Sequence, residues 1–186
     1  GFYVNFEQVQ KNDPLPKSRI ITSLDYSDPD FFEKVLDKDK MYYYDGIGNR
    51  QELKTKYIWG YSRNGFIYIR MDDGFFRITQ VGAISHFVAS HAVYSTNYHS
   101  PYYDPYMYPY HGYSNTYQDT EMRQYLFDFI NGRVLDYTEE SLSILLMEDP
   151  ELHDEYVSLS RRKRKQMRFM YIRKFNEKHT LYFPEK

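Results

Sequence analysis

The chain has 186 residues, of which 41% are hydrophobic and 19% aromatic, and its net charge of −2 is close to zero. This length suits a single domain spanning 1–186 with a sizeable core. The absence of cysteine excludes disulfides, thiolate metal sites and cysteine-based catalysis. The balanced charge gives no general attraction to nucleic acid, and no stretch of the sequence reaches the roughly 18 apolar residues of a membrane helix.

The first fifty residues contain signals for short elements. Asn5 is a candidate N-cap for a helical turn that ends before Pro14, and Asp28 followed by Pro29 indicates the start of a second helical segment. The predicted elements are a helical turn at 6–11, a strand at 17–24, a helical segment at 30–36 and a strand at 41–44.

The stretch 57–88 is predicted to be the centre of the fold. It consists of short runs rich in aromatic and β-branched residues, which favour strands. The runs are separated by Asn64-Gly65 and by Asp72-Asp73-Gly74, which favour tight turns because Asn and Gly tolerate positive φ. We therefore predict an antiparallel β-meander that residues 51–54 begin and in which Trp59 is largely buried.

Residues 94–117 differ in character from the rest of the chain. Tyr, Pro, Ser, Asn and His dominate this stretch, and its apolar residues follow no regular period. Pro101, Pro105 and Pro109 recur every four residues, which forbids a continuous helix or a central strand. We predict a long irregular loop, a kind of segment that is usually functional or mobile.

Regular structure resumes after this loop. Apolar residues in 118–130 have helical spacing, and a strand over 124–129 is the alternative. Thr138 and Asp149-Pro150 are N-cap signals for helices in the C-terminal third, 138–178, and we expect a helix break near residue 160. The sequence therefore predicts an α+β fold in which an antiparallel β-meander carries the C-terminal helices on one face.

Three segments resemble an uncharacterised domain family of exported proteins from Bacteroides-type gut bacteria. They are the opening FYVNFEQVQKNDP, the central IWGYSRNGFIYIR…FFRITQVGAISHF and the C-terminal LLMEDPELHDEYVSLSRRKRKQMRFMYIRKFNEKHTLYFP. The resemblance spans nearly the whole chain except the Tyr-rich stretch. It implies a location in the cell envelope, periplasmic or on the surface, or secretion, after removal of a signal peptide. The family has no established activity, so the resemblance implies no catalytic residue.

The chain contains no recognised catalytic or phosphate-binding motif. The stretch 45–49 superficially resembles a calcium loop but lacks the alternating acidic ligands and the closing Glu, so a turn explains it better. His99, Asp104 and His111 lie in one loop and are a chemically adequate zinc set, although their spacing matches no known pattern. We expect ordinary surface or half-buried histidines, no metal site and no cofactor.

The tyrosines of the irregular loop admit three interpretations. They form a lid over the core, a recognition surface for a glycan, a peptide or a second subunit, or part of a disordered segment. Tyr side chains are large and rigid and keep a hydroxyl for hydrogen bonding, which suits both packing and recognition. Because they cannot all face inward from one irregular segment, our hypothesis is an exposed recognition patch. Its candidate residues are Tyr102, Tyr103, Tyr106, Tyr108 and Tyr110.

Positive charge is concentrated at the C-terminal end. Residues 160–186 carry ten Lys/Arg and two Asp/Glu, a local charge of +8, whereas the other residues carry fourteen and twenty-four, or −10. This segment either contacts anionic lipid or phosphate, or docks on the acidic remainder with its long basic stems covering apolar surface. The second interpretation is favoured. The candidates for peripheral contact with an anionic membrane are Arg161, Arg162, Lys163, Arg164 and Lys165.

These features together predict a non-enzymatic exported binding or interaction module. The expected partner is a glycan or another envelope protein rather than nucleic acid, which is an unexpected ligand for an exported protein. The alternative is a hydrolase whose carboxylates converge from distant positions in the sequence. A concave pocket with at least two convergent ionisable groups favours the hydrolase, and an aromatic surface without them favours binding.

Overall fold

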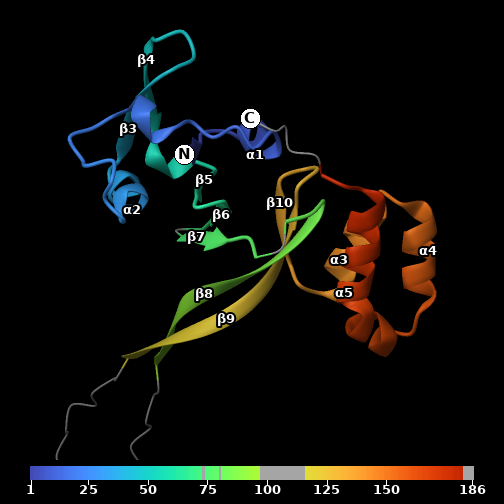
Figure 1. Cartoon of the computed structure of the whole chain (residues 1–186). Helices are drawn as coiled ribbons and strands as arrows, with labels where there is room; N and C mark the ends of the chain where they lie inside the picture. The colour runs from blue at the N-terminus through green and yellow to red at the C-terminus, as the bar shows by residue number, and fades with distance from the viewer. Residues whose placement is uncertain (73, 80, 97–115, 182–186) are drawn as a thin grey trace, which may run out of the picture.

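A computed structural model describes residues 1–72, 74–79, 81–96 and 116–181, and Figure 1 shows the whole chain. The fold is α+β, as predicted, and all of its described strand pairings are antiparallel. The helices are α1 (Phe6–Gln10), α2 (Phe31–Leu36), α3 (Glu139–Leu146), α4 (Pro150–Ser158) and α5 (Arg161–Lys178). The strands are β1 (Phe2–Tyr3), β2 (Ile20–Ile21), β3 (Lys40–Tyr44), β4 (Arg50–Lys54), β5 (Gly60–Arg63), β6 (Phe66–Met71), β7 (Gly74–Arg77), β8 (Ile84–Thr96), β9 (Thr116–Asp128) and β10 (Arg133–Asp136).

The predicted single meander is divided among three sheets. These have the strand orders β1-β5-β6-β7, β2-β3-β4 and β10-β9-β8. Residues 51–54 do not begin the meander, because β4 pairs with β3 in a separate hairpin. β8 also leaves the meander and pairs along its whole length with β9. The prediction of one sheet was wrong because the sequence pattern of a strand does not specify its partner.

The first strand of the chain completes the meander sheet. Phe2 and Tyr3 are fully buried and pair with Tyr61 and Gly60 of β5. Gly60 is required where the strands approach closely, because a Cβ there would collide with the carbonyl oxygen of Tyr68. The predicted turn between β5 and β6 is confirmed, with Asn64 at φ 52° and Gly65 at φ 78°.

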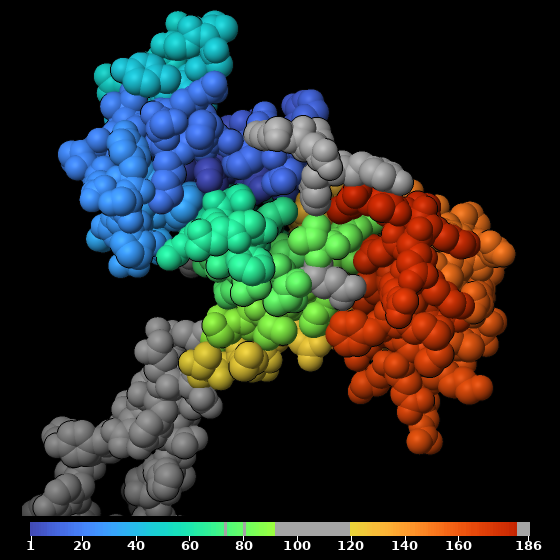
Figure 2. Space-filling model, in the orientation of Figure 1, coloured from blue at the N-terminus to red at the C-terminus, as the bar shows by residue number. Residues whose placement is uncertain are grey.

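The β8–β9 hairpin forms a wall between two hydrophobic cores. Side chains alternate between the two faces of a strand, so neighbouring residues of the hairpin enter different cores. Phe87 and Phe127 pack toward the meander sheet, whereas Ile84 and Leu126 pack toward the C-terminal helices. Figures 1 and 2 show the hairpin between the blue N-terminal part and the red helical part of the molecule.

This double burial explains why the helix predicted over 118–130 was wrong and why the strand alternative is correct. Tyr125 and Phe127 face one core and Leu126 faces the other. Both faces of the strand are therefore apolar, and the alternation that normally identifies a strand is hidden. The irregular loop predicted over 94–117 is also wrong at both ends, since β8 continues to Thr96 and β9 begins at Thr116, and its residues 97–115 lie outside the described part.

Two further predictions in the N-terminal half need correction. The strand predicted over 17–24 is reduced to the two-residue strand β2, which follows a 3₁₀ turn at Lys17–Arg19. Trp59 is only partly buried and packs at the margin of a core, with its ring 5.0 Å from that of Phe6. The interior of the N-terminal part is built instead from buried side chains of β1, α2 and the sheets, including Phe2, Phe31, Phe32, Met41 and Ile58.

The helices of the C-terminal third begin where the N-cap signals predicted. Thr138 caps α3 by accepting a hydrogen bond from the Ser141 amide, and Asp149 caps α4 by accepting one from Leu152. The break predicted near residue 160 is confirmed by Ser160, which separates α4 from α5. α5 packs on α3, α4 and β8, so the helices cover the β8–β9 face and not the meander sheet.

Candidate functional site

The β8–β9 hairpin is the structural support of the predicted tyrosine surface. Its thirteen residue pairs run from Ile84–Asp128 to Thr96–Thr116, a length of about 40 Å at 3.3 Å per residue. Figure 1 shows that its far end extends past the helices and the meander sheet. Residues 97–115 connect the paired ends at Thr96 and Thr116.

The predicted recognition residues and the possible zinc ligands lie outside the described residues. These are Tyr102, Tyr103, Tyr106, Tyr108 and Tyr110, together with His99, Asp104 and His111. Within the part that the structure describes, no group of three His, Asp or Glu side chains is placed to hold a metal ion. The loop at 45–49 is a turn in which the Asp45 carboxylate accepts hydrogen bonds from the amides of Ile47 and Asn49.

A polar cluster on the meander-facing side of the hairpin escaped the sequence prediction. The Tyr125 hydroxyl and His91 Nε2 are 2.9 Å apart, and the His91 ring also packs near Phe76. Glu121 lies opposite His91 in the strand register and forms an ion pair of 2.7 Å with Arg123, whose hydrogen bond lowers the pKa of Glu121. The signal that could have found it was the alternation of Glu121, Met122 and Arg123, which is typical of a strand with one charged face.

A second histidine lies on the helical side of the hairpin. His86 Nε2 is 3.0 Å from Gln124 Oε1, and the His86 ring makes edge contacts with Tyr137 and Phe169. The Arg168 guanidinium covers the Tyr137 ring at 3.9 Å and donates to the Tyr137 carbonyl oxygen. This cluster ties α5 to the hairpin.

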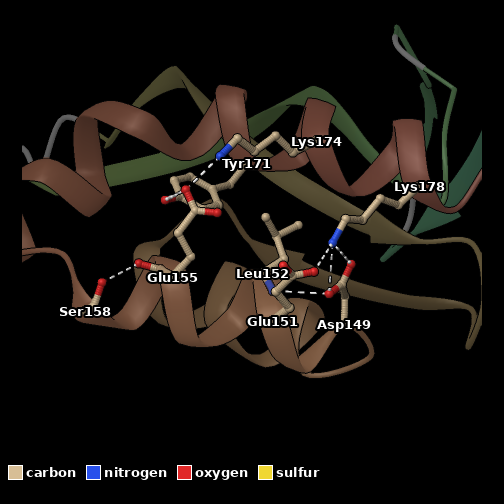
Figure 3. A network of polar contacts seen from close by, with 8 residues as sticks. All are labelled: Asp149, Glu151, Leu152, Glu155, Ser158, Tyr171, Lys174 and Lys178. Carbon is tan, nitrogen blue, oxygen red and sulfur yellow. Dashed lines mark hydrogen bonds and ion pairs between the residues drawn. The ribbon is translucent and has the colours of Figure 1, made fainter.

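Figure 3 shows how the positive C-terminal helix is held against α4. Lys178 of α5 lies 3.1 Å from a carboxylate oxygen of Asp149 and 3.0 Å from one of Glu151. One turn earlier, Lys174 pairs with Glu155 at 2.7 Å, and the Tyr171 hydroxyl donates to the same carboxylate. The basic residues of this end therefore meet acidic residues of the neighbouring helix.

The ion pairs between α4 and α5 set the protonation of their partners. The Leu152 amide and then Lys178 lower the pKa of Asp149, and Lys174 lowers that of Glu155. Burial, followed by the neighbouring Glu155, raises the pKa of Tyr171 to about 12. At neutral pH the carboxylates are charged and the tyrosine is a neutral donor, which is the arrangement that holds α4 and α5 together.

The five basic residues at the start of α5 divide into two groups. Arg161 pairs with Glu139 of α3 at 2.9 Å, and Arg164 is partly buried. Arg162, Lys163 and Lys165 are exposed and make no ion pair with any described residue. These three positive charges sit at the N-terminus of α5, where the helix dipole disfavours them and Ser160 supplies no side-chain cap.

Two hollows on the described surface contain ionisable side chains and are open to solvent. In the first these side chains are hydrogen-bonded or ion-paired, and in the second the carboxylates are exposed. One of about 440 Å³ includes Lys17, Asp28 and Arg63. These bond respectively to the Tyr26 carbonyl oxygen, Lys34 and Glu33. Another, of about 520 Å³, lies beside Tyr125 and contains the exposed carboxylates of Asp72 and Asp136.

Every described carboxyl group whose pKa is shifted has a pKa below its ordinary value. Ion pairs and hydrogen bonds lower the pKa of each such group, and burial opposes the change without reversing it. The groups are Glu7, Asp25, Asp28, Asp45, Glu52, Glu121, Glu139, Asp149 and Glu155.

Comparison with protein-family models, curated proteins and solved structures finds no match to this chain. Among the helices of the described residues, none is long and apolar enough to cross a membrane.

Proposed function

We propose that this protein is a non-enzymatic, exported binding module that recognises a glycan or another envelope protein through the tyrosines of residues 97–115. The observation that supports the proposal is the β8–β9 hairpin, which continues as a paired ribbon beyond the body of the molecule. Its root is fixed between two cores, so the hairpin carries the ends of the Tyr-rich segment on strands that are anchored in the body of the molecule.

The composition of the segment suits recognition. Tyr102, Tyr103, Tyr106, Tyr108 and Tyr110 offer flat rings that stack on a sugar face and hydroxyls that form hydrogen bonds. Tyr has two side-chain torsions, so its ordering on binding costs little entropy for the area it buries. Three intervening prolines fix their own φ angles and lower the entropy of the free segment further.

The carboxyl groups with shifted pKa values favour this function over a hydrolase that uses one of them as a general acid. A hydrolase that uses a carboxylic acid to protonate its leaving group needs that group's pKa to be raised. The shifted carboxyl groups here have lowered pKa values and are ionised at neutral pH, with most of them in ion pairs. They make local ion pairs and hydrogen bonds, and as ionised groups they do not supply a general acid.

The test replaces Tyr106, Tyr108 and Tyr110 together by Ser. We expect binding to a glycan array, or to immobilised envelope extract, to fall at least tenfold while the melting temperature changes by less than about 2 °C. The matched control replaces Tyr44 and Tyr57, which are exposed on the N-terminal part, and should leave binding intact. A large fall in melting temperature, or a wild-type protein that binds neither probe, contradicts the recognition function.

A further inference from the structure

The outer edge of β8 is closed at its root and open beyond it. In an antiparallel strand, alternate residues direct both backbone groups toward one neighbour. Ile84 directs its amide and carbonyl away from β9, because the Asn176 side chain bonds to both at 2.8 Å. Two residues on, the His86 carbonyl oxygen accepts a hydrogen bond of 2.9 Å from the Thr79 hydroxyl. The backbone amide and carbonyl groups of the even-numbered β8 residues therefore point away from β9, toward the outer edge of the strand.

The next outward positions have no such covering. Val88 and Ser90 are exposed, and no residue in the described ranges bonds to their outward amide or carbonyl groups. β8 stays paired with β9 as far as Thr96, so the same alternation continues through Ala92, Tyr94 and Thr96. The backbone groups at these five positions thus face away from β9, and β8 has no second strand partner among the described residues.

The sequence of this edge lacks the features that keep sheet edges apart. Residues 84–96, ISHFVASHAVYST, contain no Asp, Glu, Lys, Arg, Pro or Gly. Proteins protect exposed edge strands with charges, prolines or bulges. The opposite edge of the hairpin is protected, because β9 carries Asp119, Glu121 and Arg123 and β10 covers its residues 125–128.

We infer that β8 is a dimerisation edge, on which the β8 strand of a second copy of this chain pairs in antiparallel fashion. Pairing about a two-fold axis at Ala92 places Val88 opposite Thr96 of the partner subunit and Ser90 opposite Tyr94 of the partner subunit. Every cross-strand pair is then uncharged, so the edge is complementary to itself. The product is a four-stranded sheet with the order β9-β8-β8-β9.

The geometry favours a second copy over other occupants. Each β8 leaves its own body at Ile84 and ends at Thr96, so antiparallel pairing places the two bodies at opposite ends of the shared sheet. The pairing also stabilises the far end of the hairpin. A two-stranded ribbon is only marginally stable in water, whereas a four-stranded sheet is more stable. A closed two-fold contact is the commonest form of homo-oligomer.

The test uses Ser90→Pro in the full chain. Proline removes the outward amide of Ser90 but no hydrogen bond to β9, so the hairpin itself is preserved while the new rung is lost. The mass of the wild type in sedimentation at about 50 μM should be twice the chain mass of 22.7 kDa, and that of Ser90→Pro should be the chain mass. Met122→Lys, which changes the β9 residue opposite Ser90, is the control and should remain dimeric.

Hydrogen exchange gives a second readout that does not depend on the variant. The amides of Val88 and Ser90 should become at least tenfold more protected as the protein concentration is raised from 1 to about 100 μM. The Ala89 amide, which faces β9, should show a much smaller change. A wild type that is monomeric at 100 μM, or a Ser90→Pro protein that is still dimeric, overturns the proposed edge. If the edge binds a peptide instead of a second copy, the wild type will be monomeric at 100 μM.

Discussion

Asn176→Ala tests whether a single side chain holds the C-terminal helix to the hairpin. The Asn176 amide acts as a substitute strand at the root of β8, with Oδ1 accepting from the Ile84 amide and Nδ2 donating to the Ile84 carbonyl oxygen. It also lies against Gly82, where any Cβ would collide with the amide. Alanine removes both hydrogen bonds and leaves both backbone groups of Ile84 without their partners.

The expected cost follows from the burial of Ile84, which is 2% exposed. A buried backbone group that loses its partner costs about 1–3 kcal/mol. Two such groups set an upper limit, and water that enters at the strand edge recovers part of the loss. We therefore expect Asn176→Ala to lower the free energy of unfolding by about 2–4 kcal/mol. For a chain of this size that corresponds to a fall in melting temperature of about 5–15 °C.

Urea unfolding followed by far-ultraviolet circular dichroism measures this change. The midpoint should fall while the slope with denaturant stays constant, because the same surface is exposed on unfolding. Gln166→Ala is the matched control, since Gln166 is exposed on the same helix and its replacement should change stability by less than about 0.5 kcal/mol. A loss below about 1 kcal/mol for Asn176→Ala, or one equal to the control, would refute the argument.

Two further predictions concern Trp59 and the start of α5. Trp59→Ala should cost about 2–3 kcal/mol, less than a fully buried Trp, because its ring packs only at the core margin beside Phe6; unchanged thermal unfolding would contradict that contact. Replacing Arg162, Lys163 and Lys165 by Gln should leave stability unchanged or raise it by up to about 1 kcal/mol, because the helix dipole disfavours these charges, and wild-type binding to phosphatidylglycerol vesicles should be weak. Strong, salt-sensitive vesicle binding that the triple variant loses would instead assign these residues to an anionic membrane.

The distribution of the positive charge shows how the structure refines a prediction from composition. The sequence indicated that the basic C-terminal end docks on acidic residues, and Lys174 and Lys178 do so through Glu155 and Asp149. Those partners come from the adjacent helix and not from the acidic remainder as a whole. Arg162 shows the limit of the prediction, because a local charge sum does not tell which basic side chains face a partner.

The features that the sequence determined by itself are local. Thr138 and Asp149 cap their helices through hydrogen bonds to amides three residues on, and Asn64-Gly65 forms its turn through its own backbone angles. These interactions involve residues within one turn of the chain, so they are present in the sequence pattern. Together with the apolar spacing of the C-terminal third, they are sufficient to predict the α+β class.

The tertiary structure alone decided which strands meet and which residues share a surface. The apolar spacing of β9 favours a helix, and only the placement of Leu126 and Phe127 in different cores explains why it is a strand. His91 contacts Tyr125 because β8 pairs with β9 rather than with β7. Strand pairing depends on residues far apart in the sequence, and its energy comes from burial on both faces of the sheet. That energy exists only once the hairpin lies between the meander sheet and the helices.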